Sequence, residues 1–234
     1  MSDIKGVHPD KDAAPVITID GPSGSGKGTI CQRLAQQLGF HLLDSGALYR
    51  LTAVACVAQS VDLQDIDAAA NVARHLNISF KPTDQGVVAI LDGSDVTADI
   101  RKEAAGMGAS VVAAHIPVRE ALLARQRSFQ QSPGLVADGR DMGTTVFPQA
   151  SVKVFLTASA EERAQRRYKQ LLGRGESANL RVLLDDIEAR DKRDTERSAS
   201  PLQPADDAIT IDSTTMSINE VLDAIMVRVK QRIE

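Results

Sequence analysis

The sequence predicts an α/β protein with a parallel sheet, an N-terminal phosphate-binding loop and a smaller inserted sub-domain. An apolar run over 16–20 leads into a glycine-rich stretch and then a helical pattern. After it, short apolar runs alternate with helical patterns, which is typical of strands and helices that build a parallel sheet. The block over 61–96 breaks this alternation with a pattern typical of antiparallel strands.

Composition excludes several classes of protein. The chain has 234 residues, 43% of them hydrophobic, and a net charge of −4, so no basic surface for a nucleic-acid polymer is expected. No apolar run reaches 18 residues and residues 1–14 are polar, so we expect no membrane segment and a cytoplasmic protein. Residues 1–14 are predicted to be a flexible extension ahead of one domain over 15–234. Cys31 and Cys56 are too few for a disulfide framework and are expected to be buried thiols.

The glycine-rich stretch has the G-x-x-x-x-G-K spacing of a Walker A loop. Glycines permit backbone angles closed to other residues, so that successive N–H groups converge on phosphate oxygens at a helix N-terminus. The lysine adds a cation for the outer phosphates. The predicted ATP-binding residues are Gly21, Pro22, Ser23, Gly24, Ser25, Gly26, Lys27, Gly28 and Thr29.

One position departs from the common form of this loop. Gly28 follows the lysine where a serine or threonine is usual, and the hydroxyl comes one place later at Thr29. A bound Mg²⁺ is therefore expected to rely mainly on phosphate oxygens and water, with Thr29 as the one candidate protein ligand.

A second anion site is suggested after the next strand, predicted over 40–43. Asp44, Ser45 and Gly46 begin a helix over 47–59, and Arg50 follows one turn later. A hydroxyl and a guanidinium at a helix N-terminus can bind an anion. Asp and Ser are also favoured N-cap residues without any ligand, and this alternative stays open.

The block over 61–96 and the segment that follows it combine helices with a small sheet. Helical patterns cover 67–75, 99–114 and 117–131, and strands are predicted over 76–80 and 87–91 with a longer loop between them. Asp92-Gly93 marks a further tight turn.

Polar residues follow the next predicted strand, over 134–137. Arg140 and Asp141 come directly after it, where ligands gather at the carboxyl ends of parallel strands. A binding site is favoured over a self-contained turn salt bridge. Another strand is predicted over 152–156.

The segment over 159–197 is densely charged and reads as a helical hairpin. Most of its arginines are interpreted as a solvated face with i,i+4 ion pairs. Gly173-Arg174-Gly175 supplies a flexible joint, and Arg190, Asp194 and Arg197 share one helix face. A strand over 208–211 and a helix that starts with a Ser217-x-x-Glu220 capping box complete the chain.

These parts match what phosphoryl transfer requires: a donor loop, an acceptor site, cations around the transferring group and a closing element that excludes water. The residues alone indicate a phosphotransferase for a small phosphorylated acceptor. A P-loop switch protein is an alternative, although no clear NKxD element is present. An ATP-dependent DNA-associated protein fits the acidic balance poorly.

Six runs between Pro15 and the C-terminal helix form a specific pattern: ITIDGPSGSGKGT, LLDSGALYR, VREALL, ADGRDMGTTVFP, ARDKRDTER and IDSTTMSI. In these runs the chain is similar to the bacterial cytidylate kinases. The resemblance implies an adenylate-kinase-like three-layer fold around a five-stranded parallel sheet. It also implies that 61–130 is the NMP-binding insert and that 165–185 form the lid.

The same resemblance implies an enzyme of pyrimidine nucleotide metabolism that phosphorylates CMP, and dCMP as well, with ATP and Mg²⁺. Kinases for UMP, AMP or shikimate are the alternatives, and a monomer is expected. Lys27, Arg140, Arg190 and Arg197 are the implied catalytic residues. The acceptor phosphate is assigned to Ser45, Arg50, Arg140 and Arg197, the sugar to Arg190 and Asp194, and the base to Ser110, Arg119 and Asp141.

Overall fold

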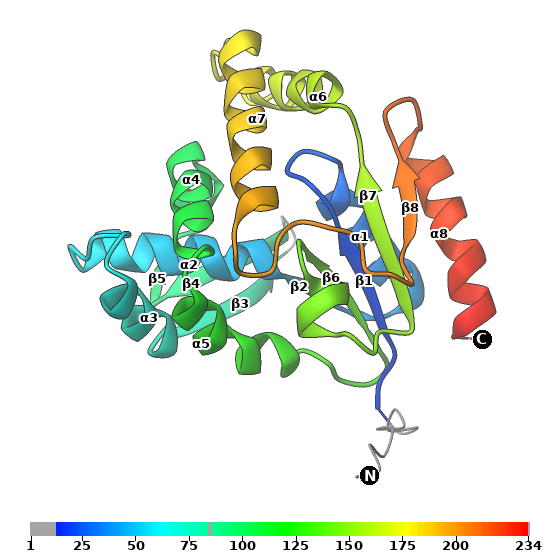
Figure 1. Cartoon of the computed structure of the whole chain (residues 1–234), viewed down its shortest axis with the longest axis horizontal. Coiled ribbons are helices and arrows are strands. Elements are labelled where there is room, and N and C mark those ends of the chain that lie inside the picture. Colours follow the sequence, from blue (N-terminus) through cyan, green and yellow to red (C-terminus); the bar gives the residue numbers. More distant parts are fainter. Residues whose placement is uncertain (1–12, 84–85, 234) are drawn as a thin grey trace.

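The computed structural model describes residues 13–83 and 86–233, and its centre is a five-stranded parallel sheet (Figure 1). The strand order is β2-β6-β1-β7-β8. This confirms the predicted fold class. The strands are β1 (Val16–Asp20), β2 (His41–Asp44), β6 (Leu135–Gly139), β7 (Val152–Thr157) and β8 (Ile209–Asp212). The predicted extension over 1–14 falls mostly outside the described residues.

Strand β1 occupies the middle of the sheet, paired with β6 on one side and β7 on the other. All pairs in this sheet are parallel, so the strands end at one edge. The segments that follow β1, β6 and β7 therefore meet there, and they include the glycine loop and the Arg140-Asp141 turn. Ligands of open parallel sheets bind at this edge.

Two apolar cores lie on the two faces of the sheet. Ile17 and Ile19 of β1 pack with helices α1 (Lys27–Leu38) and α8 (Ile218–Arg232). Val16 belongs to the core that includes α2 (Ser45–Ala58), α5 (Ile116–Arg127) and the insert. The alternation follows from the period of two along a strand. Thr18 and Asp20 share the face of Val16 and are buried, so a carboxyl group sits in the interior next to the glycine loop.

The helices are close to their predicted positions, with two corrections. The helix predicted over 99–114 is a short 3₁₀ turn, an extended Lys102 and then a helix. The helix predicted to reach Gln131 ends at Arg127, because Phe129 turns back to pack against the core. The helices are α1 (Lys27–Leu38), α2 (Ser45–Ala58), α3 (Ile66–Arg74), η1 (Asp99–Arg101), α4 (Glu103–Val112), α5 (Ile116–Arg127), η2 (Met142–Val146), α6 (Ala160–Leu172), α7 (Leu180–Glu196) and α8 (Ile218–Arg232).

Local signals set several helix ends as predicted. Asp44 caps α2 by accepting a hydrogen bond from the Ala47 N–H at 2.9 Å. Ser217 and Glu220 form the predicted capping box at the start of α8. Gly39 ends α1 in the left-handed conformation with φ of 66°, and glycine adopts that conformation without the penalty of a Cβ atom.

The insert contains a separate antiparallel sheet, as its pattern predicts. Its strands are β3 (Ile78–Thr83), β4 (Gly86–Leu91) and β5 (Ser94–Asp95), in the order β3-β4-β5. Thr83 pairs with Gly86, so the prediction of a longer loop between β3 and β4 is wrong. Helix α4 packs on α2, and α5 packs on α3. The bounds 61–130 for the insert as one unit stay a prediction.

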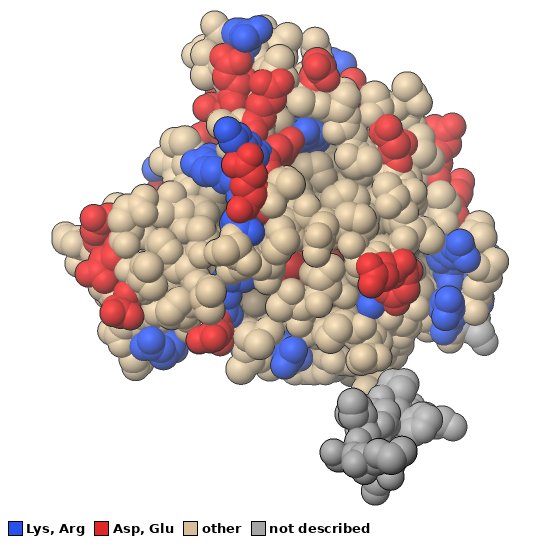
Figure 2. Space-filling view, in the orientation of Figure 1, with Lys and Arg blue, Asp and Glu red and all other residues tan. Residues whose placement is uncertain are grey.

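Helices α6 and α7 form the predicted hairpin, which stands over the carboxyl edge of the sheet with α7 beside α4 (Figure 1). Acidic and basic side chains crowd together on α7 and where it meets α4, while large areas elsewhere on the same face carry few charges (Figure 2). Charge on this side of the molecule is therefore concentrated over the edge where ligands bind.

Across residues 13–83 and 86–233, no single helix has the length and apolar character to cross a membrane. Helices α4 and α5 meet the test only when taken together, across a bend of 104°. Both cysteines, Cys31 and Cys56, are free and buried, as expected.

Candidate active site

The glycine loop after β1 has the backbone angles that its sequence predicts. Gly24 and Gly26 have φ of 78° and 94°, in the left-handed region that favours glycine. Gly21 has φ of 149°, and a Cβ atom built on it would lie 2.0 Å from the Leu156 carbonyl oxygen. The loop is thus fitted against the end of β7 as well as bent toward α1.

Four side chains bind the carbonyl oxygens of this loop, and one of them is Ser213, whose Oγ donates to Ser25 at 3.4 Å. Lys27 Nζ donates to Pro22 at 2.7 Å, Arg163 Nη1 to Ser23 at 3.1 Å and Arg166 Nη1 to Ser25 at 3.3 Å. Because a trans peptide is planar, its C=O and N–H point in opposite directions. Fixing these carbonyls therefore fixes the opposite direction of the N–H groups of residues 23, 24 and 26.

The role of Arg163 is a finding that the sequence did not predict. Its helix reads as a solvated charged face, but Arg163 is only 4% exposed, so that interpretation is wrong for this residue. The spacing of apolar residues along α6 does not indicate this burial. The Arg163 guanidinium is buried against polar groups, namely the main chain of the glycine loop and a carboxylate of α7. An arginine in the first helical turn after a core strand is the one available signal.

The Lys27 ammonium lies among buried charges. Burial and the nearby Arg140 lower the pKa of Lys27 to about 8, although Asp138 and Asp20 oppose this shift. Burial raises the pKa of Asp138 to about 6, and Asp44 adds to the rise while Lys27 opposes it. Asp20 and Asp138 had no role predicted from the sequence. Each lies at or near the end of an apolar strand, β1 or β6, and an acid in that position is the sequence signal that could have indicated a role in the site.

Asp20 connects the end of β1, next to the glycine loop, to the turn η2 after β6. Its two carboxylate oxygens accept hydrogen bonds from the N–H groups of Met142 and Gly143, each at 2.8 Å. Burial raises the Asp20 pKa to about 7, although these two hydrogen bonds act in the opposite direction. The carboxyl group holds the start of the π-helical turn η2, directly after Arg140 and Asp141.

A second cavity opens beside the loop and gathers the side chains that the resemblance assigns to the acceptor. They come from α2, α4, α5, the turn after β6, and α7, which are far apart in the sequence. All nine line this one cavity: Ser45, Arg50, Ser110, Arg119, Arg140, Asp141, Arg190, Asp194 and Arg197. We call it the acceptor cleft. Tyr49, which the sequence analysis did not single out, also lines it, with the Arg119 guanidinium 5.7 Å from its ring centre.

Two ion pairs organise the acceptor cleft. Arg119 pairs with Asp141 Oδ2, and Arg140 Nε donates to Asp194 Oδ2 at 2.9 Å. All four side chains are at least four-fifths buried. For Asp194, burial favours the neutral acid, but Arg140 and Arg190 outweigh it and the pKa lies below its ordinary value. The self-contained turn salt bridge considered for Arg140 and Asp141 is absent from the described residues, since each pairs with another element.

Several buried donors in the cleft have no partner within the described residues: Ser110 Oγ, Arg190 Nε and Arg197 Nη2. A buried polar group without a hydrogen bond is destabilising, so such groups mark places for a ligand. Burial and the proximity of Arg140 lower the pKa of Arg190 to about 10. This excess of guanidinium groups favours an anionic ligand. Arg190 Nη1 also donates to Ser23 Oγ at 3.1 Å, so it contacts the glycine loop too.

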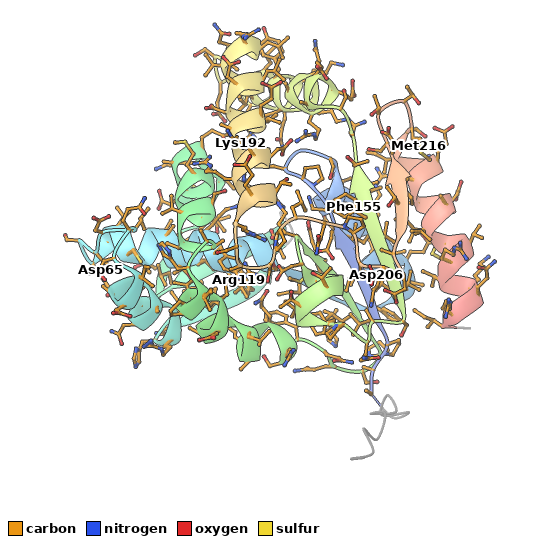
Figure 3. All side chains as sticks on the ribbon, in the orientation of Figure 1. Asp65, Arg119, Phe155, Lys192, Asp206 and Met216 are labelled. Carbon is orange, nitrogen blue, oxygen red and sulfur yellow. The ribbon has the colours of Figure 1, made fainter. Side chains whose placement is uncertain are left out.

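Along the glycine loop lies a cavity of about 700 Å³, which we call the donor cavity. Its wall includes residues 23–29 of the glycine loop but not the predicted ATP-binding residues Gly21 and Pro22. Its far end is formed by Met216, Ile218 and Val221, near the start of α8. Figure 3 shows Met216 near β8 and Arg119 near the lower end of α7. The donor cavity and the acceptor cleft share Gly46, Arg50, Gly139 and Arg140 in their walls, so the two cavities adjoin.

Candidate metal ligands are few. No cluster of three His, Cys, Asp or Glu side chains suited to a metal occurs in 13–83 and 86–233. Thr29 is exposed at the first turn of α1, and Asp138 Oδ2 lies 3.7 Å from where a Cβ of Gly28 would be. These are oxygen donors of the kind that Mg²⁺ accepts alongside phosphates and water.

A lysine-bearing glycine loop at the carboxyl edge of a parallel sheet, next to an arginine-lined cleft, defines a P-loop phosphotransferase. Comparison with known proteins identifies its family. The family described as "Cytidylate kinase" matches residues 17–231.

Curated relatives agree with this match. The cytidylate kinase of Stutzerimonas stutzeri is 58% identical over 93% of this chain and 96% of its own. Those of Pseudomonas syringae pv. tomato and Photobacterium profundum are 59% and 55% identical, each over 94% of this chain and over 96% and 97% of theirs. The chain belongs to the cytidylate kinase family.

Proposed function

We propose that the protein transfers the γ-phosphoryl group of ATP to CMP, and also to dCMP, forming CDP or dCDP and ADP. The observation that carries this proposal is membership of the cytidylate kinase family over nearly the whole chain. The site supports it with two adjacent cavities that share one edge of the sheet. We further propose a monomer in the cytoplasm, and light scattering on a sizing column tests the oligomeric state.

In this proposal the donor phosphates lie in the glycine loop. The N–H groups of residues 24 and 26, held by the arginine contacts on the opposite carbonyls, face the phosphate oxygens. Lys27 then exchanges the Pro22 carbonyl for the outer phosphates. Because Lys27 is buried beside other cations, an anion binds strongly to it.

The acceptor phosphate takes the arginine-rich part of the acceptor cleft, with Ser45, Arg50, Arg140 and Arg197 as ligands. Arg190 bridges toward the transferring group, because it reaches both the cleft and Ser23 of the glycine loop. Asp194 holds Arg140 in place and faces the sugar. No general base is needed, since the acceptor phosphate is already an anion at neutral pH.

The base of the acceptor is assigned to Ser110, Arg119 and Asp141. Cytosine carries an exocyclic amino group where uracil carries a carbonyl oxygen. The ion pair with Arg119 uses Asp141 Oδ2, and Oδ1 is the acceptor we propose for the cytosine amino group. Pairing of this kind discriminates between bases by about 1–3 kcal/mol.

Magnesium fits the donor side of the site. Thr29 and Asp138 would hold the ion through their oxygens together with phosphate oxygens and water. When bound, the ion neutralises charge on the transferring phosphates.

The acceptor cleft measures about 50 Å³, less than the roughly 300 Å³ at which ligand pockets begin. It shares Arg50 and Arg190 with a cavity of about 220 Å³ between α4 and α7. A nucleotide therefore requires α7 and α4 to part and then close again, and we propose that the segment over 165–185 moves with them as a lid. Closure excludes water that would otherwise hydrolyse the donor.

An ADP-release assay tests the proposed function. Purified protein is incubated with ATP and Mg²⁺ and with CMP, dCMP, UMP, AMP, GMP, dTMP, shikimate or no acceptor. Release that strongly favours CMP and dCMP, with little in the blank, is expected. Preference for UMP, AMP or shikimate would reassign the acceptor, and equal release without any acceptor would indicate an ATPase.

A further inference from the structure

The Arg163 side chain ties three segments of the site together. Its Nε donates to the Ala158 carbonyl at the end of β7 at 2.9 Å, and Nη1 donates to the Ser23 carbonyl at 3.1 Å. The same guanidinium forms a two-point ion pair with Asp191 of α7, with bonds of 3.0 and 2.5 Å. Such forked geometry fixes the orientation of both partners.

The contact of Arg163 with the glycine loop is close. A Cβ atom on Gly24 would lie 3.2 Å from the Arg163 Cβ, so the loop packs directly on the start of α6. The bond to the Ser23 carbonyl sets the direction of the Gly24 N–H, because both belong to one planar peptide unit. Arg163 thus positions a main-chain donor in the loop without touching the phosphate itself.

Asp191 belongs to the segment of α7 that carries acceptor residues. Arg190 precedes it and donates to Ser23 Oγ at 3.1 Å. Asp194, one turn later, holds Arg140 at 2.9 Å. This segment of α7 therefore contacts both sites. It contacts Ser23 of the glycine loop directly through Arg190 and indirectly through the Arg163 side chain that Asp191 binds. It contacts the acceptor cleft through the bond to Arg140.

We propose that Arg163 and Asp191 are positioning residues that couple binding in the donor loop to binding in the acceptor cleft. A donor nucleotide that orders the loop stabilises the Arg163 to Asp191 pair and hence the acceptor-binding position of α7. The acceptor stabilises the donor-binding loop by the same factor, since coupling between two sites is reciprocal. This inference rests on the proposed function.

Isothermal titration calorimetry tests the coupling. The dissociation constant of CMP is measured alone and with a saturating non-hydrolysable ATP analogue and Mg²⁺. In the parent protein the analogue is expected to tighten CMP binding by about 5-fold or more, the lower end of typical allosteric couplings. In the variants Asp191→Asn and Arg163→Lys, the factor by which the analogue tightens CMP binding is expected to fall toward one. A lysine at position 163 lacks the forked donors that bind Ser23 and Asp191 together. In both variants, the dissociation constant of CMP alone should change by less than about 3-fold.

The control is Asp185→Asn, which breaks the exposed Arg181 to Asp185 pair on the same helix and should leave the coupling unchanged. Asp191→Asn combined with Arg163→Lys should lower the coupling no further than either alone, because both act through one interaction. Parent-like coupling in both single variants, with only a lower melting temperature, would make the pair purely structural and overturn the inference. Absence of coupling in the parent protein would overturn it too. Failure of the parent to bind CMP at all would instead contradict the proposed function.

Discussion

The donor loop and the acceptor cleft lie at the same edge of the sheet but are built in different ways. The loop is one continuous run, residues 21–29, whose working parts are main-chain N–H groups set by glycine angles. The cleft takes its side chains from five segments between Ser45 and Arg197. Local sequence therefore encodes the loop, whereas the cleft exists only once α2, α4, α5 and α7 have packed around the end of β6.

This contrast predicts different sensitivities to substitution. Substitutions in the glycine loop should affect the backbone geometry of the loop or remove its one cation, Lys27. Substitutions in the acceptor cleft should mainly change the selectivity for the acceptor, because several side chains share the binding of one ligand.

The largest effect is expected at Gly21. Replacement by alanine places a Cβ 2.0 Å from the Leu156 carbonyl oxygen at a φ of 149°, so β7 or the loop must shift. We expect a loss of several kcal/mol in unfolding free energy, or no folded protein. Gly39→Ala is the matched control: its φ is 66° with no atom within 4 Å of the added Cβ, and a cost of about 1 kcal/mol is expected. Urea unfolding compares the two, and equal losses would contradict the backbone argument.

Lys27→Ala should lower kcat by about 10²- to 10³-fold, the effect typical of removing one positioned electrostatic group. The fold should survive, since among the described residues the side chain bonds only to the loop, and a charge buried beside Arg140 is removed. Steady-state kinetics with CMP and circular dichroism measure the two effects. Near-normal turnover would remove Lys27 from the donor site.

Asp20→Asn should change how stability depends on pH. In the folded protein the Asp20 pKa is about 7 against an ordinary 3.8, so folding binds a proton between these values. The protonated Asp20 side chain contributes fully to the unfolding free energy below pH 4, and this contribution is lost as pH rises through about 7. The unfolding free energy of the parent relative to Asp20→Asn should therefore fall between pH 4 and 7, by up to about 4 kcal/mol. Urea unfolding across this range measures the difference, and a difference independent of pH would contradict the raised pKa.

Asp141→Asn should have the smallest effect and the most selective one. Its amide can donate to uracil, so the ratio of kcat/KM for CMP to that for UMP should narrow by about 5- to 150-fold, the equivalent of 1–3 kcal/mol. The comparison of two substrates in one variant separates selectivity from a general loss of folding. An unchanged ratio would refute the assignment of Asp141 to the base.

Much of the fold could be read from local sequence. The glycine loop, the cap at Asp44, the capping box at Ser217 and the strand at Val16–Asp20 occur as predicted, because glycine angles, caps and apolar periodicity act over a few residues. Boundaries set by packing could not be read in this way. The helix end at Arg127 depends on where Phe129 finds the core.

The sequence by itself therefore determined the elements, the phosphate-binding loop and the candidate residues of the second site. Only the tertiary structure decided the strand order, which brings Asp20 beside the turn after β6, and the burial of Arg163 between the loop and Asp191. The physical reason is that desolvation and ion pairing depend on which faces meet. Charge patterns along one helix cannot show whether a guanidinium meets water or a carbonyl oxygen from a distant loop.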